Sequence, residues 1–515
     1  MTEQRKSRLT LALLFLLLLV LAALRPLAVP DEGRYGEIGR WMLYSGDWLT
    51  PRLNGIPFFH KPPYLYWLEA VSLSVFGVNA WALRLVPALH AGLMLLAMYA
   101  AVRRFATEAL ARRAVWMLGS SLTFLLGGQY VNHDMLVAAW IGVAIWCFAL
   151  AFMHGEKPDA ALARWGFVAC ALGLLSKGLI GVALPGLVLL IWLAWTRQLK
   201  KIAYLPWLSG LALFALIALP WFWITEQRFP GMLDYMFGKQ QASRFSTTFF
   251  NNARPWWFYA PCLVALLFPW VFFVPNQAFS QAGRALPAIN SIASAWLALC
   301  WIWVLAIIAF FSIPSSKIIG YAFPVMTPLA VLAAIGWDDA MARLARFGLA
   351  RRTREKLFAS LCVLSIGIAI AGNTVAARYI EKYSAQDVAK ALRAAGGQPA
   401  DTVYLLGDYA YDLPFYRQAS TPMIVIQDWP ALRRLAGDDW QHELLDGTVF
   451  EASSGAVLQA PQALAQPSTK TRLWLVSSHD TPVAGFVRLF KGNDWSLYLP
   501  EAASESTPEG PVPAK

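Results

Sequence analysis

The sequence predicts a mainly α-helical protein that crosses a membrane many times and carries a small α/β domain at its C-terminal end. Of its 515 residues, 58% are hydrophobic and only 14% are charged, whereas a soluble domain has about a quarter charged residues. Long apolar runs recur along the first 377 residues and then stop. We therefore expect lipid to surround the first part of the chain and water to surround the last part.

The apolar runs approach the ~20 residues that a membrane-spanning helix needs, so we expect about 11–13 transmembrane helices. The first run follows Arg5, Lys6 and Arg8, as in a signal peptide, but no A-x-A-like site precedes Pro30, which favours a retained helix. The runs lie near residues 9–29, 80–102, 114–128, 133–153, 164–178, 179–196, 203–225, 256–275, 291–311, 318–336 and 357–377.

Basic residues gather in alternate loops of this predicted topology. If the N-terminus is cytoplasmic, the loops on its side hold Arg103, Arg104, Arg112, Arg113 and the basic stretch 351–356. This distribution follows the positive-inside rule, so the net charge of +12 indicates a membrane and not a nucleic acid partner. An odd number of spans then places the segment after residue 378 outside, which is the periplasm for an inner-membrane protein.

The segment 378–501 is polar and mixed, as expected of a water-exposed α/β domain. Short strands are predicted at 403–406, 423–426, 472–476 and 495–499. A tail at 502–515 has a composition typical of disorder. Residues 1–377 form the predicted membrane domain, whose informative outer loops are 30–79 and 226–255.

Two carboxylates are predicted at the outer membrane face. Asp31, followed by Glu32, ends the first span, and Asp134 lies in the next outer turn. A carboxylate at the end of a span is costly unless it is paired, capped or hydrated. Two such groups can hold a divalent cation or share acid–base work. The alternative for each aspartate is a structural helix cap.

Five cations on the same face run against the inside bias of basic residues. Phosphate would explain them, because Arg offers a planar fork and Lys a point charge. The alternative is that each one reaches for lipid headgroups. These cations are Lys61, Lys177, Arg244, Arg254 and Lys317.

Several motifs resemble a known family. PDEGRYGEI (30–38), SGDWLTPRLNG (45–55) and FFHKPPYLYW (58–67) resemble the first outer loop of bacterial type C glycosyltransferases, a group that includes lipid A aminoarabinose transferases and relatives of protein mannosyltransferases. RPWWFY (254–259) and SIPSSKIIGYAFPVMTPLA (312–330) resemble later blocks. The resemblance covers most of residues 1–335 and implies the type C glycosyltransferase architecture.

The resemblance also implies roles for particular residues. Asp31 matches the essential acid of the first loop, and Asp134 matches a second acid. Lys61, Arg254 and Tyr321 match groups that bind the phosphate of the carrier lipid, and Lys317 joins them as a candidate. Secondary candidates are Glu32, Arg34, Arg244 and Lys177.

One departure from the family concerns a metal. The aminoarabinose transferases usually have Glu where this chain has His60, and they offer histidines where this chain has Phe249–Asn252. These departures argue against a metal site like theirs and against lipid A aminoarabinose transfer itself, and they leave His60 as the candidate ligand for a divalent cation.

The implied activity is an inverting transfer of a sugar from a polyprenyl-phosphate donor to a glycolipid resembling lipid A, at the periplasmic face. Asp31 would be the general base for a hydroxyl acceptor, or would orient a phosphate acceptor, directly or through a metal. Protein O-mannosyl transfer is the second enzyme hypothesis. A flippase or transporter is a third, but it predicts binding groups near the bilayer centre.

Overall fold

The computed structural model describes residues 2–242, 252–277, 292–435, 437–465, 472–478 and 482–501. The chain divides into two compact units, which are described separately. The first comprises Met1–Leu24, Phe59–Leu68 and Leu83–Val375. The second comprises Arg25–Phe58, Glu69–Ala82 and Ala376–Lys515. Arg244 and the tail 502–515 lie outside the described residues.

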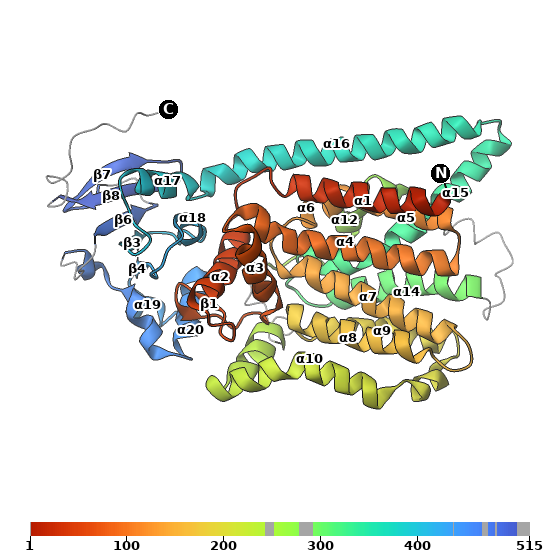
Figure 1. Ribbon diagram of the computed structural model, residues 1–515, viewed down its shortest axis with the longest axis horizontal. Coiled ribbons are helices and arrows are strands. Elements are labelled where there is room, and N and C mark those ends of the chain that lie inside the picture. Colours follow the sequence, from red (N-terminus) through yellow and green to blue (C-terminus); the bar gives the residue numbers. More distant parts are fainter. Residues whose placement is uncertain are drawn as a thin grey trace. The chain divides into compact units, whose positions relative to one another are not determined.

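The first unit is built from helices, most of which run side by side along one direction (Figure 1). Polar residues begin several of them: Thr107, Asn132 and Asp159 each accept a hydrogen bond from a backbone N–H of the helix that follows. The helices are α1 (Glu3–Leu21), α4 (Ala80–Phe105), α5 (Glu108–Ser120), α6 (Leu122–Gly127), α7 (His133–Met153), α8 (Ala160–Lys177), α9 (Ile180–Trp195), α10 (Trp207–Arg228), α12 (Tyr259–Leu267), α14 (Ile292–Ser312), α15 (Met326–Arg346) and α16 (Arg351–Tyr383).

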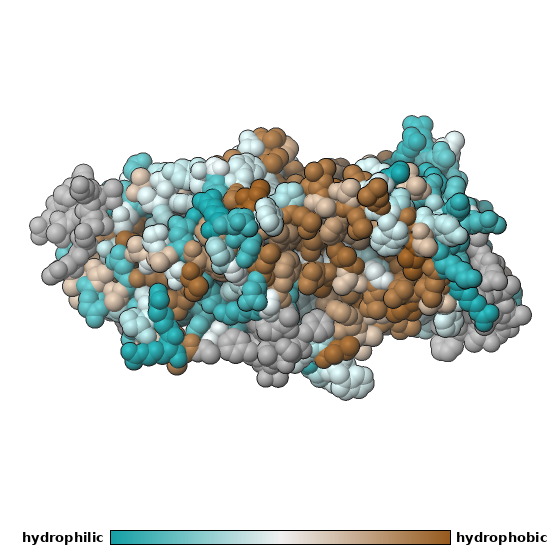
Figure 2. Space-filling view, turned by 90° about the horizontal axis from the view of Figure 1, so that it is seen from below, coloured by the Kyte–Doolittle hydropathy of each residue, from teal (hydrophilic) through white to brown (hydrophobic). Residues whose placement is uncertain are grey.

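In the described part of the chain, seven helices are long and apolar enough to cross a membrane, or eight if the bent pair Trp256–Leu267 and Trp270–Gln277 forms one span. This confirms a mainly helical polytopic membrane protein. Three of the predicted runs are not among these helices: α1 starts with charged residues, the run 114–128 is divided between the short helices α5 and α6, and α9 has only 16 residues. Figure 2 shows apolar side chains gathered over the helical part.

Helix α7 lies inside the first unit, where 78% of its apolar 18-residue stretch is buried within the protein. Its neighbours α8 and α9 approach each other closely where Gly173 faces Gly181, because a Cβ at Gly181 would collide with the backbone of Gly173. This close approach places the end of α8 beside the start of α9. Both ends contribute to the cavity described below.

The second unit contains the predicted α/β domain. Its six-stranded sheet has the order β5-β4-β3-β6-β8-β7, with parallel pairing from β5 to β6 and antiparallel pairing from β6 to β7. The strands are β3 (Thr402–Leu406), β4 (Ile424–Ile426), β5 (Leu458–Gln459), β6 (Leu473–Ser477), β7 (Phe486–Lys491) and β8 (Ser496–Pro500). The helices are α17 (Gln386–Ala394), α18 (Leu413–Arg417), α19 (Trp429–Leu432) and α20 (Trp440–Thr448).

Much of the first outer loop packs with this domain, although the sequence assigned the whole loop to the membrane domain. It forms α2 (Asp31–Ser45), the hairpin β1 (Arg52–Leu53) and β2 (Ile56–Pro57), and α3 (Tyr64–Phe76). Asn54 at the hairpin turn exchanges two 2.8 Å hydrogen bonds with the backbone of Met423. These long-range bonds explain why residues 25–58 group with the C-terminal domain.

Candidate active site

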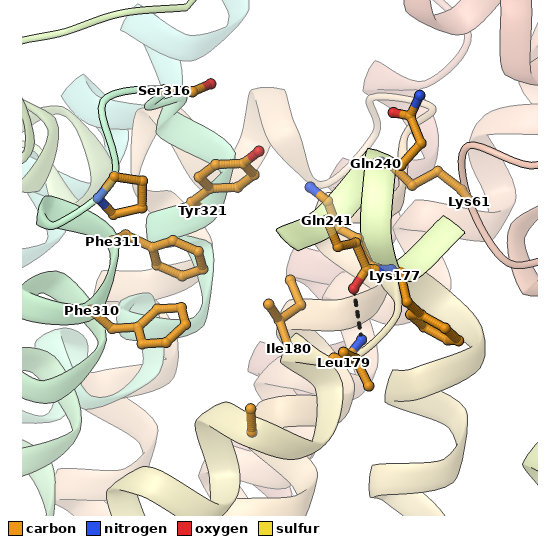
Figure 3. A pocket seen from close by; sticks show the side chains of 13 residues that line it. Lys61, Lys177, Leu179, Ile180, Gln240, Gln241, Phe310, Phe311, Ser316 and Tyr321 are labelled. Carbon is orange, nitrogen blue, oxygen red and sulfur yellow. Dashed lines mark hydrogen bonds between the residues drawn. The ribbon is translucent and has the colours of Figure 1, made fainter. Parts of the chain in front are cut away.

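A cavity of about 410 Å³ in the first unit combines cationic and apolar walls (Figure 3). Its polar lining comes from Lys61, Lys177, Gln240, Gln241, Ser316 and Tyr321. Apolar side chains complete the wall, among them Leu179, Ile180, Phe310 and Phe311. The cavity is therefore suited to a ligand with an anionic end and an apolar body.

Lys177 and Asp134 form a buried ion pair at the edge of this cavity. Lys177 ends α8, Asp134 lies in the first turn of α7, and their side chains are only 10% and 8% exposed. The cap of α7 is Asn132, which accepts the backbone N–H of Asp134 at 2.9 Å. The Asp134 carboxylate is therefore turned to Lys177 and to the amide of Asn132 at 3.1 Å, and does not serve as the helix cap.

Tyr321 completes this side of the cavity. Its ring stacks on Phe311 with the ring centroids 4.9 Å apart, and the Lys177 ammonium lies 4.8 Å from its centroid. Gly320, one residue earlier, packs directly against Asp134, and a Cβ there would collide with the carboxylate. Two adjacent residues thus shape this side of the cavity: Tyr321 forms its aromatic wall, and Gly320 leaves room for the Asp134 carboxylate.

Lys61 lines the opposite side, together with a segment of irregular helix at Asp234–Ala242. The hydroxyl of Tyr235 lies 2.8 Å from His60 Nε2 and accepts the Gln240 amide at 3.0 Å. Gln241 accepts the backbone N–H of Leu179 at 3.1 Å, the bond drawn in Figure 3. His60 thus helps to anchor the segment that brings two glutamines to the cavity.

A metal centre has no ready set of ligands in the described part of the chain. In the described ranges, no group of three or more His, Cys, Asp or Glu side chains is placed to hold a metal ion. His60, the proposed ligand, already has the Tyr235 hydroxyl at its Nε2. We derive no catalytic step through a metal.

Arg254 and Lys317 meet in a short antiparallel pairing of two loops. The Lys317 ammonium donates to the carbonyls of Arg254 at 3.1 Å and Pro314 at 2.5 Å, and burial lowers its pKa. The Arg254 side chain is exposed. Of the four predicted phosphate ligands, Lys61 and Tyr321 line the cavity; Arg254 and Lys317 are not among its described lining residues, although Pro314 and Ser316 of the Lys317 loop are.

Asp31, Glu32 and Arg34 belong to the second unit. Glu32 is buried and accepts from Arg25 at 2.9 Å and from the Ala28 N–H at 2.7 Å, so its role is to fix the start of α2. Asp31 accepts from Arg34 at 2.6 Å and keeps its side chain 33% exposed.

Arg34 also pairs with Glu443 of the C-terminal domain. Burial opposes its charge, but the carboxylates of Glu443 and Asp31 raise the pKa of Arg34 above its ordinary value. The cap position before α2 is Pro30, which makes no side-chain cap bond. Asp31 is thus an oriented, accessible carboxylate.

The fold is that of a polytopic membrane protein with the architecture of type C glycosyltransferases. Residues 8–236 match the family model of dolichyl-phosphate-mannose-protein mannosyltransferases. The chain is 33% identical over 321 residues to an undecaprenyl phosphate-α-4-amino-4-deoxy-L-arabinose arabinosyl transferase of Pseudomonas fluorescens, covering 60% of this chain and 54% of that one. A Pseudomonas aeruginosa protein of the same name is 32% identical over 310 residues, covering 59% and 54%.

Among solved structures, ArnT from Cupriavidus metallidurans bound to undecaprenyl phosphate matches with a TM-score of 0.80 and 24% identity, over 97% of this chain and 99% of that chain. An Archaeoglobus fulgidus oligosaccharyltransferase matches with a TM-score of 0.51 and 15% identity, over 81% and 63%. The chain spans about half the length of the curated relatives it matches. The resemblance predicted from the first loop is confirmed, because the chain is similar to aminoarabinose transferases over about 60% of its length.

Proposed function

We propose that this protein transfers a sugar from a polyprenyl-phosphate donor to a lipid A-like glycolipid, with the periplasm as the reaction side. The observation that carries the proposal is the cavity in which Lys61 and Lys177 face walls formed by Phe310, Phe311 and Ile180. A lipid phosphate needs cationic side chains for its phosphate and apolar side chains for its hydrocarbon chain. The curated relatives' names specify undecaprenyl phosphate-linked aminoarabinose, which is the donor we propose for this chain.

In this mechanism Lys61 and Tyr321 bind the donor phosphate. When the bond between the sugar and the phosphate breaks, negative charge grows on the departing phosphate oxygen. A fixed ammonium and a hydroxyl donor in a site with apolar walls stabilise that charge in the transition state. Lys177 adds a second positive charge, which Asp134 holds in position.

The acceptor is activated by Asp31 in this proposal. A hydroxyl acceptor loses its proton to the Asp31 carboxylate as it attacks the anomeric carbon, and the attack inverts that carbon. The support is that Arg34 orients Asp31 while its side chain stays partly exposed. Because the proposed reaction side is the periplasm, the proposal also places the second unit in the periplasm and the N-terminus in the cytoplasm.

The test uses the purified full-length protein with undecaprenyl-phosphate aminoarabinose and lipid A, and mass spectrometry of the glycolipid product. The expected result is a lipid A species that carries the added pentose. Lys61→Ala should lose product formation by about a hundredfold or more, whereas Lys382→Ala, an exposed lysine, should keep it. Equal product from wild type and Lys61→Ala would refute the assignment of Lys61.

A protein acceptor is the second candidate, favoured by the match of residues 8–236 to the protein mannosyltransferase model. Incubation with polyprenyl-phosphate mannose and membrane protein distinguishes the two. If the mannose is labelled, label in the protein fraction with none in glycolipid would favour this alternative.

A further inference from the structure

We propose that a second cavity in the first unit binds the phosphate headgroup of an anionic membrane lipid. This cavity forms where α1 and α5 begin, α15 ends and α16 begins. Its volume is about 880 Å³, compared with about 410 Å³ for the donor cavity. The proposal does not depend on the sugar-transfer function.

The two cavities open toward opposite membrane faces. The apolar stretch Ile319–Arg346 touches both, with Tyr321 at the donor cavity and Met341 at the second one. The roughly twenty residues between them rise about 30 Å as a helix, which is the thickness of the hydrocarbon core. The second cavity therefore lies at the headgroup level of the other leaflet.

The second cavity carries excess positive charge. Glu3 pairs with Lys6 at 2.8 Å and with Arg112 at 2.5 Å, and Asp338 pairs with Arg113. Glu355 pairs with Arg351 at 2.8 Å. With Arg354 included, the lining has five cations and three carboxylates, which leaves a net charge of +2.

Arg354 is the cation with donor capacity to spare. Among the described residues it makes one long hydrogen bond of 3.3 Å, to the carbonyl of Met341. Its Nε is buried and has no hydrogen-bond partner among the described residues. Burying a donor without a partner is unfavourable, so a phosphate oxygen that accepts from this Nε would remove that cost.

The remaining lining fits the part of a lipid just below its phosphate. Trp116, Trp337 and Phe358 form an apolar wall beside the charged groups. The two tryptophans suit this level of a bilayer because their amphipathic rings favour the headgroup region. Basic pockets between membrane helices are a recurring solution for anionic headgroups. The ligand class is thus a phospholipid with a net negative headgroup.

The experiment titrates delipidated full-length protein in neutral detergent with dioleoylphosphatidylglycerol, and follows binding by native mass spectrometry. Parallel titrations use dioleoylphosphatidylcholine and glycerol 3-phosphate. We expect phosphatidylglycerol to bind about tenfold more tightly than either, because it alone supplies net charge and acyl chains. Equal binding of the two lipids would overturn the proposal, and equal binding of glycerol 3-phosphate would overturn the lipid as the ligand.

Two matched variants of α16 locate the site. Arg354→Gln should reduce the preference for phosphatidylglycerol about tenfold, whereas Arg352→Gln, an exposed position that does not belong to the described lining, should retain it. Should Arg354→Gln fail to fold, Arg112→Gln provides the same readout from α5. If the lining variant and the Arg352→Gln control lose or keep the preference equally, the cavity is not the binding site.

Discussion

Lys177 at the end of α8 and Asp134 at the start of α7 form a buried ion pair beside the cavity lined by Lys61 and Tyr321. Breaking such a pair leaves one buried charge without compensation and costs about 3–5 kcal/mol. We expect Asp134→Asn to lower both the unfolding temperature and the transfer rate. The double variant Asp134→Asn with Lys177→Met should recover stability without recovering activity. Thermal unfolding in detergent and product formation measure the two effects, and recovery of full activity would show that the pair is only structural.

Gly320 tests the same site through packing. An added Cβ would enter the space of the Asp134 carboxylate, so Gly320→Ala should displace Asp134 and cost about 1–3 kcal/mol. We expect transfer to fall while expression persists. Gly367→Ala is the control, because a Cβ at this position in α16 meets open space. A Gly320→Ala protein as active and stable as the control would contradict the packing seen here.

Asp31 and Glu32 are adjacent but should respond differently. Asp31→Asn removes the proposed base and should reduce turnover by about 10²–10⁴ while leaving the unfolding temperature nearly unchanged. Glu32→Gln breaks the buried contact with Arg25 and should mainly lower stability. The measurement is a kcat and a melting curve for each variant. Near-normal turnover of Asp31→Asn would remove it from the mechanism.

Asp412 makes stability depend on pH. Burial raises its pKa from 3.8 to about 6, although Ser384 and the Ala385 N–H donate to the carboxylate. Between pH 4 and 6 the folded protein holds a proton that the unfolded chain has lost, so stability falls as pH rises through this range and levels off above it. The effect is at most about 3 kcal/mol. Asp412→Asn should flatten the profile of unfolding temperature against pH, and an unchanged profile would assign the dependence to another group.

The sequence predicted much of the architecture because apolar runs and strand patterns are local signals. Strands β3, β4, β6 and β8 lie at the predicted positions. Strand β7 was missed because its side chains are mostly exposed, and β5 was missed because it has only two residues. The C-terminal domain also recruits residues 25–58, which no local pattern could predict, since the bonds from Asn54 reach Met423.

In the candidate site, too, residues within local motifs were predicted and long-range contacts were not. Lys61 and Tyr321 were predicted from motifs, Lys177 was predicted as a cation of the outer face, and all three line one cavity. Gln240 and Gln241 were missed, because amides in a polar loop give no periodic signal. The pairing of Arg34 with Glu443 could not be predicted from local patterns either, since the two residues are 409 positions apart.

The central claim is that the cavity of Lys61, Lys177 and Tyr321 holds the phosphate end of a polyprenyl donor. The direct measurement is photocrosslinking with a polyprenyl phosphate that carries a photoreactive group in its first isoprene unit, followed by peptide mapping. The account predicts label on the cavity wall, at Leu179, Ile180, Phe310 or Phe311, and competition by unmodified undecaprenyl phosphate. Competed label that instead maps to the apolar cavity lined by Phe148, Phe167 and Leu211, with none at the first cavity, would contradict it.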